Sequence, residues 1–177
     1  FASNGGMGAT WGQDGISACS FPTNISNVPV EVVEARSGLV VEKRELAADS
    51  GGPGRWRGGL GLASALRVPE DFQGDVWVSI LSDRTAHAAQ GRLGGAPGSL
   101  RTNTLNDDIA LHPKKRVQLR AGDRLTVHMP GGGGVGDPRE RAKEAVAADI
   151  KDRYVSEAQA QTVYGYGRRA NIQKDKA

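Results

Sequence analysis

Residues 123–141, DRLTVHMPGGGGVGDPRER, combine the features of a nucleotide-binding turn. An apolar run with strand character leads into Gly131-x-Gly133-x-x-Gly136, and a predicted helix follows. A dinucleotide-binding fold also needs a second strand that ends in an acidic residue about 20 residues further on. The sequence there, DRYVSEAQAQTVYGY, predicts a turn and another helix. We therefore expect a turn whose glycines let two backbones approach closely, with a phosphate held by backbone amides as the alternative.

A second glycine-rich loop, residues 50–59 (SGGPGRWRGG), carries two cations beside an aromatic ring. It lacks the lysine and the Ser/Thr of a phosphate-binding P-loop. Arg55 and Arg57, on either side of Trp56, could bind an anion or a partner chain. They could equally stack on the ring and hold the loop by cation–π contact. Both interpretations stay open from the sequence.

The three histidines, His87, His112 and His128, do not have the spacing of a metal site. His87 lies in SDRTAHAAQG, close to Asp83 and Arg84. Because a carboxylate can orient a histidine as a general base, His87 is the best candidate for chemistry or for substrate contact. The alternative is a loop histidine whose neighbours satisfy it. The sequence predicts no metal ligand and assigns no catalytic residue.

Residues 23–29, TNISNVP, are dense in hydrogen-bonding groups. Asn24 and Asn27 can form turns with their own backbone, or they can contact a substrate or a second subunit. Cys19 is the single cysteine of the chain, so no internal disulfide is possible. We expect Cys19 to be a small core residue and the protein to lie in a reducing cytoplasm.

Length and composition limit the class of protein. The chain has 177 residues, which fits one domain. Its net charge of +3 comes from interspersed acids and bases, without the basic stripe of a nucleic-acid surface. No apolar run approaches the ~20 residues that a membrane-spanning helix needs. We therefore predict neither a nucleic acid nor a membrane as a partner.

Apolar alternation broken by glycine and proline predicts a body rich in β-strands. Strands are expected at 29–35, 39–47, 62–68, 75–82, 99–104, 116–120 and 124–129, with turns at Ser37-Gly38 and at 121–123. Two capping-box patterns then predict helices, Asp137 with Glu140 and Ser156 with Gln159. The expected fold class is α+β: a β-rich body with glycine-rich loops over residues 1–137 and a short helical C-terminal tail over residues 138–177.

Five stretches in a fixed order carry a family resemblance. They are GGMGATWGQDG, PTNISNVPVEVVE, ELAADSGGPGRWRGGLG, PGGGGVGDPRERAKEAVAADI and VSEAQAQTVYG. Together they resemble the C-terminal part of the hydantoinase B/5-oxoprolinase family, in particular its N-methylhydantoinase B-type subunits. The resemblance extends to about residue 166. It identifies Gly131–Gly136 as a turn of that family and not as a nucleotide fingerprint.

The resemblance implies an ATP-dependent enzyme built from several parts. Such enzymes pair an A-type, ATP-using subunit with a B-type subunit and open cyclic amides such as hydantoins and 5-oxoproline. ATP and a divalent metal are then expected in the whole complex and none in this chain, because the family's His and Asp metal ligands lie in an N-terminal region that is absent here. The expected partners are the A-type subunit and the N-terminal part of the B-type subunit. The residues expected to touch a partner or substrate are Arg55, Trp56, Arg57, Asn24, Asn27 and His87.

Two other functions stay open. Related enzymes carboxylate ketones such as acetone or acetophenone, so the substrate could be a ketone instead of a cyclic amide. Alternatively, the chain could be a non-catalytic binding module that keeps the fold. Because the chain starts at Phe1 inside a glycine-rich stretch, we expect a fragment or a split small subunit whose active site is completed elsewhere.

Overall fold

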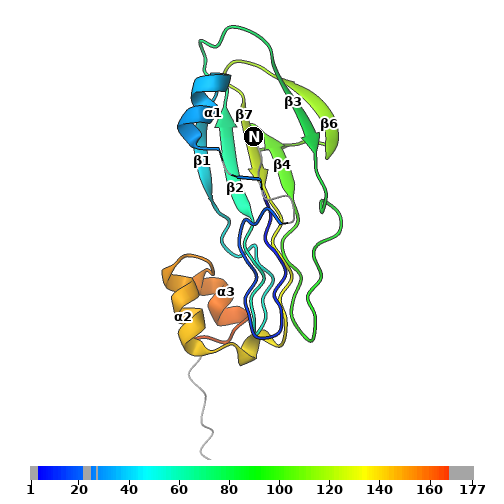
Figure 1. The fold of residues 1–177 in the computed structure, drawn as a ribbon, viewed down its shortest axis with the longest axis vertical. Helices are drawn as coiled ribbons and strands as arrows, with labels where there is room; N and C mark the ends of the chain where they lie inside the picture. Colours follow the sequence, from blue (N-terminus) through cyan, green and yellow to red (C-terminus); the bar gives the residue numbers. More distant parts are fainter. Residues whose placement is uncertain (1–3, 22–24, 27, 168–177) are drawn as a thin grey trace, which may run out of the picture.

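The computed structural model describes residues 4–21, 25–26 and 28–167 and has the α+β class expected from the sequence (Figure 1). An antiparallel sheet of five strands has the order β1-β2-β7-β4-β5. Its strands are β1 (Val40–Leu46), β2 (Leu62–Arg67), β7 (Arg124–His128), β4 (Thr102–Leu105) and β5 (Ile109–Ala110). Strands β3 (Val76–Leu81) and β6 (Lys114–Leu119) form a separate antiparallel pair. Among the described residues, no helix is long and apolar enough to cross a membrane.

The two sheets enclose a small apolar core. Val68, Leu119 and Leu125 are its buried centre. In β3 the apolar alternation has the predicted effect, since Ile80 is buried while its neighbours Ser79 and Leu81 are exposed. The strand expectations for β1, β2, β3, β6 and β7 are confirmed within a few residues. Strand β4 begins later than expected, and the two-residue β5 was not predicted.

Residues 29–35 were predicted as a strand, and this prediction is wrong: Val30–Ser37 form helix α1. Two local signals decide it. Pro29 precedes the first turn, and Gly38 ends the helix in the left-handed region at φ 69°, where its N–H donates to the Glu34 carbonyl. No residue of the helix is buried. The apolar alternation that suggested a strand is therefore not stabilised by packing against a partner strand. Ser37-Gly38 is consequently a helix end and not a hairpin turn.

The C-terminal tail forms two helices, but only the second begins as its cap predicts. Asp137 caps a single 3₁₀ turn, η1 (Pro138–Glu140), after which Arg141 is extended at ψ 132°. Helix α2 therefore starts late, at Lys143–Lys151. Helix α3 (Glu157–Thr162) begins at Ser156, whose side chain accepts from the Gln159 N–H as expected. The division between a body ending at residue 137 and a separate tail stays a prediction.

Four glycine-rich segments lie side by side below the sheets and belong to no helix and to none of the strands (Figure 1). They are residues 5–15, 51–61, 91–98 and 130–136, and we call them the glycine lattice. Backbone hydrogen bonds join them, with N–H to C=O distances of 2.9 Å (Gly6 to Pro130), 2.8 Å (Gly52 to Gly132), 2.8 Å (Gly59 to Met7) and 3.0 Å (Gly134 to Ala96). The lattice is therefore held by backbone groups of segments that are distant in the sequence.

Close approach explains the glycines of the motif at 131–136. A Cβ atom added to Gly132 would lie 1.9 Å from the Met7 carbonyl oxygen, and one added to Gly58 would lie 2.0 Å from that of Gly132. The amides of Gly132, Gly134 and Gly136 already donate to protein carbonyls, so they are not available to cradle a phosphate. The interpretation as a close-packing turn is confirmed.

Candidate functional site: an aromatic surface on the glycine lattice

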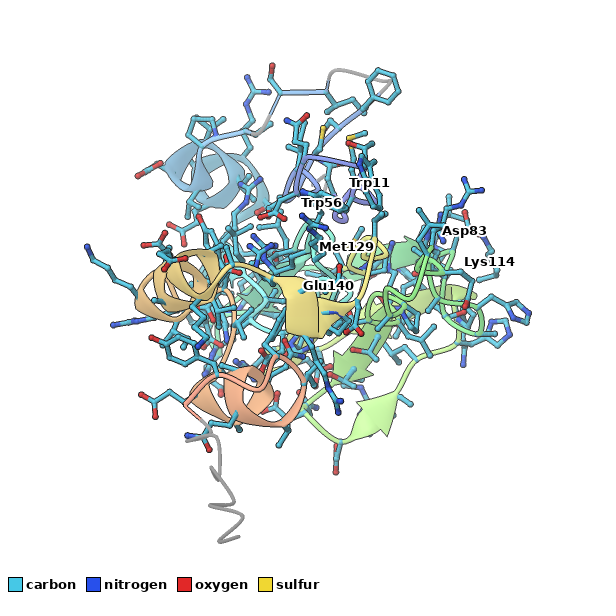
Figure 2. The ribbon with its side chains drawn as sticks, turned by 90° about the horizontal axis from the view of Figure 1, so that it is seen from below. Trp11, Trp56, Asp83, Lys114, Met129 and Glu140 are labelled. Carbon is cyan, nitrogen blue, oxygen red and sulfur yellow. The ribbon has the colours of Figure 1, made fainter. Side chains whose placement is uncertain are left out.

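Trp11 and Trp56 lie together on the surface of the lattice (Figure 2). With Arg55, which stacks on both rings, they form an aromatic cluster. The two indole rings lie 4.4 Å apart at an interplanar angle of 55°. The Arg55 guanidinium sits 4.9 Å from the centre of the Trp56 ring and 6.0 Å from that of Trp11. Trp11 is 67% exposed. Exposed tryptophan stacked with arginine is the composition typical of energetic centres in protein interfaces.

The lattice backbone positions both rings. Trp56 exchanges two backbone hydrogen bonds with Val135, at 3.0 and 2.9 Å. Trp11 stands at a tight turn that is closed by mutual backbone bonds between Thr10 and Gln13. Arg55 is held by an exposed ion pair with Glu140 at 3.5 Å. The cluster is therefore presented by fixed backbone and not by a free loop tip.

Arg57, the other cation of the predicted loop, points inward and is 5% exposed. With Arg141 and Asp149, which are also buried, and the half-buried Asp14, it forms a group of two cations and two anions, which we call the buried charge cluster. The Asp149 carboxylate receives Arg57 Nε at 3.4 Å and Arg141 Nη2 at 2.8 Å. Arg141 also binds both oxygens of Asp14, at 2.8 and 2.7 Å. This cluster joins helix α2 to the lattice, which is a structural role.

The charges in this cluster shift the acid–base properties of its members. Burial alone would raise the pKa of Asp14, but the hydrogen bonds and charge of Arg141, with the nearby Arg57, outweigh it and lower that pKa below its usual value. Burial would also lower the pKa of Arg141, yet Asp14 and Asp149 raise it further above its usual range. Burial raises the pKa of Tyr164, beside the same cluster, to about 12. All three groups thus keep their ordinary charge at neutral pH.

His87 is exposed and lies in the connection between β3 and β4. Asp83, the carboxylate expected to orient it, instead pairs with Lys114 at 2.8 Å (Figure 2). No hydrogen bond or ion pair joins His87 to another described residue, so Asp83 does not support a role as a base. Its contact with substrate or partner stays a prediction. Asn24 and Asn27 lie outside the described residues.

The described part of the chain offers no group of side chains suited to a metal ion. Within residues 4–21, 25–26 and 28–167, no three His, Cys, Asp or Glu side chains gather in a way that could hold a metal ion. Cys19 is half-buried and is not in a disulfide. His112 and His128 are exposed, and His128 lies in β7. The expectation that ATP and a divalent metal belong to a larger complex stays a prediction.

Sequence reasoning missed Trp11 and the partners of Arg57. Trp11 lies far along the chain from Trp56, and nothing local to either residue indicates that they meet. For Asp149 a signal existed: it stands three residues after Val146 and one before Ile150, on the apolar face of the predicted helix. A carboxylate at such a position indicates a buried cation nearby.

Comparison with known proteins gives a consistent result. The sequence model of the family described as hydantoinase B/oxoprolinase matches residues 2–138. A candidate B-type component of a D-/L-hydantoinase from Pseudomonas sp. (strain NS671) is 32% identical over 169 residues, covering 91% of this chain and 28% of that protein.

Two solved structures are similar over nearly the whole chain. A nucleotide-free acetone carboxylase aligns with a TM-score of 0.75 and 26% identity, over 91% of this chain and 26% of that one. An ATP-dependent caprolactamase from Pseudomonas jessenii aligns with a TM-score of 0.76 and 25% identity, over 98% of this chain and 31% of that one. The chain thus spans less than a third of the length of each of these three proteins.

Proposed function

The chain belongs to the hydantoinase B/oxoprolinase family, and we propose that it is the lattice-forming part of a B-type subunit in an ATP-dependent enzyme that opens cyclic amides. Two similar proteins support this reaction class, a candidate B-type hydantoinase component and an ATP-dependent caprolactamase. A ring amide is stabilised by resonance, so its hydrolysis gains from coupling to ATP. ATP and a divalent metal would bind to the remainder of the assembly.

Within that assembly we assign this chain a supporting and docking role. The observation that carries it is the combination of an interlocked backbone lattice with the exposed aromatic cluster of Trp11, Arg55 and Trp56. The lattice offers a fixed platform, and the cluster has the composition that protein partners use as an anchor. The partner proposed for this surface is the A-type, ATP-using subunit.

The test is assembly with that partner. Trp11→Ala together with Arg55→Ala should weaken its binding about 30-fold or more, because truncation of a central interface anchor costs about 2 kcal/mol or more. Binding is measured through sedimentation of the co-expressed complex. Arg120→Ala, at an exposed arginine in the turn between β6 and β7, is the matched control. Unchanged sedimentation and unchanged turnover in the double variant would remove the docking role.

Arg57 is left out of this test for a structural reason. The sequence singles out Arg55 and Arg57 alike as contact residues, but Arg57 is buried between Asp149 and the Gly58 carbonyl. Its loss would unfold or loosen the chain whatever the partner does. The surface pair therefore separates docking from stability.

A second reaction, ATP-dependent carboxylation of a ketone, is favoured by the similarity to acetone carboxylase. Substrate panels on the assembled enzyme separate the two. Hydrolysis of ATP that needs bicarbonate and a ketone indicates the carboxylase, whereas ring opening of hydantoins or lactams without bicarbonate indicates the amidohydrolase. A non-catalytic binding module, the third possibility, would show neither activity and would purify as a monomer.

A further inference from the structure

An open cavity of about 670 Å³ lies between the five-stranded sheet, β3 and α1, apart from both the aromatic cluster and the buried charge cluster. Its walls are mainly apolar. Leu66, Leu125 and Val127 line it from the large sheet, and Val78 and Ile80 line it from β3. The core between the two sheets is therefore incompletely filled along this side. A site with such walls is suited to the apolar part of a small molecule.

The floor of this cavity carries an unsatisfied hydroxyl. Ser64 is 2% exposed, and its Oγ has no hydrogen-bond partner in the described part of the chain. A buried hydroxyl without a partner is costly, and native structures rarely tolerate it without a reason. Ser64 lines the cavity, so a rotamer that turns its Oγ toward the cavity would let a bound group supply the missing hydrogen bond.

The opposite side of the floor carries a cation. Ser64 and Asn103 both stand opposite Val127, on β2 and β4, so the three side chains form one row on one face of the sheet. Asn103 Oδ1 accepts from Arg101 Nε at 3.2 Å. No carboxylate among the described residues forms an ion pair with Arg101. Burial of the Arg101 guanidinium lowers its pKa, and the nearby Asp83 only partly opposes this effect.

We propose that this cavity binds a medium-length aliphatic carboxylate that carries a hydroxyl or carbonyl oxygen at its far end. The carboxylate pairs with Arg101, the chain lies between the sheets, and the distal oxygen hydrogen-bonds Ser64 Oγ. Ser64 and Asn103 are separated by two strand spacings, about 10 Å, which an acid of about eight carbons spans. This site rests on the cavity alone and does not depend on the proposed assembly.

The probes are 8-hydroxyoctanoate, octanoate without the hydroxyl, and 1,8-octanediol without the carboxylate. Trp77 lines the cavity, so binding is followed by the NMR shift of its indole N–H in the 177-residue chain. We expect 8-hydroxyoctanoate to bind most tightly. Loss of the carboxylate should weaken binding by about tenfold or more, because hydrogen bonds to charged groups are worth more than neutral ones.

Two variants assign the ends of the ligand. Ser64→Ala should abolish the preference for 8-hydroxyoctanoate over octanoate, and the free variant should be at least as stable as the wild type because an unsatisfied hydroxyl is removed. Arg101→Gln should abolish the preference for 8-hydroxyoctanoate over the diol, while Arg120→Gln leaves it unchanged. No movement of the Trp77 signal with any probe, or preferences that survive both variants, would overturn the proposal.

Discussion

Two guanidinium groups meet one carboxylate at Asp149, on the buried face of helix α2. The Arg57 and Arg141 side chains are 6% and 4% exposed, and Asp149 contacts both. Charges in such a setting are tolerated because each is paired, and the removal of a partner leaves an uncompensated ion away from water. Arg141 also pairs with Asp14, the second anion of the cluster. The position of Arg141 is therefore fixed by two carboxylates at once.

Asp149→Asn should therefore destabilise the chain by about 3–5 kcal/mol, the usual cost of breaking a buried ion pair. Urea or guanidinium unfolding followed by tryptophan fluorescence measures it. Asp152→Asn, three residues away and exposed, should stay within about 0.5 kcal/mol of the wild type. Equal unfolding midpoints for Asp149→Asn and wild type would show that the cluster contributes little.

Asp14 gives the same cluster a dependence on pH. Its pKa is lowered in the folded chain, so its contribution to stability is complete above the unfolded value of about 4 and is lost as the pH falls through the folded value. Asp14→Asn should be less stable at pH 7, and its curve of unfolding free energy against pH should be flatter below about pH 4. The two curves should converge in acid. Parallel curves at all pH values would contradict this assignment.

The glycine lattice differs from an ordinary β structure because it leaves no room for side chains between its segments. In a sheet the side chains fill the space between layers. In the lattice, backbone atoms occupy that space, and even one methyl group would meet a carbonyl oxygen at Gly131 or Gly132. At these positions glycine is required because a Cβ atom would not fit, and not because the backbone is left-handed.

Gly132→Ala should accordingly cost about 3 kcal/mol or more, because its new Cβ meets the Met7 backbone and two segments must separate. Gly8→Ala provides a matched control within the lattice, because its Cβ would find nothing nearer than 3.7 Å. The control should change the unfolding free energy by about 0.5 kcal/mol or less. Similar losses in both variants would mean that glycine acts here through chain entropy instead of space.

Sequence patterns predicted the strands better than they predicted the contacts. Alternation of apolar and polar residues predicted β3 and β7, because such a pattern arises within one strand whose two faces differ in burial. The start of α3 was predicted from a local signal as well, the capping of the Gln159 N–H by Ser156. Helix α1 was missed because its apolar and polar residues alternate as in a strand. No residue of this segment is buried against a neighbouring strand, so the helix signals at Pro29 and Gly38 decide its structure. The partner of each lattice glycine could not be predicted, since the pairing depends on segments far away in the sequence.

Contacts between distant segments also decided what the sequence could predict about the candidate surface. Arg55 and Trp56 could be singled out, and the structure places both at the surface of the lattice. The sequence could not separate Arg55 from Arg57, although Arg55 is exposed and Arg57 is buried. Side-chain direction in an irregular segment follows from what packs against it, and here the packing residues, Arg141 and Asp149, come from the other end of the chain.

At the scale of the whole molecule, three features occupy separate regions. The sheets hold the apolar core and the cavity beside it, the lattice carries the aromatic cluster, and the two C-terminal helices pack around their own small core of Val146, Val155, Ala160 and Tyr164. The buried charge cluster links the last two regions. The aromatic cluster, the cavity and the buried charge cluster can therefore be altered one at a time.

The lattice also limits how the length of this chain can change during evolution. Insertion of one residue into any of its four segments moves every later glycine of that segment by about 3.8 Å, the spacing of successive Cα atoms. Side chains then arrive at positions such as Gly58 and Gly132, where the structure leaves room for a hydrogen atom alone. Tolerated insertions and deletions are thus directed to the connections outside the lattice, and the four segments vary by substitution at fixed length.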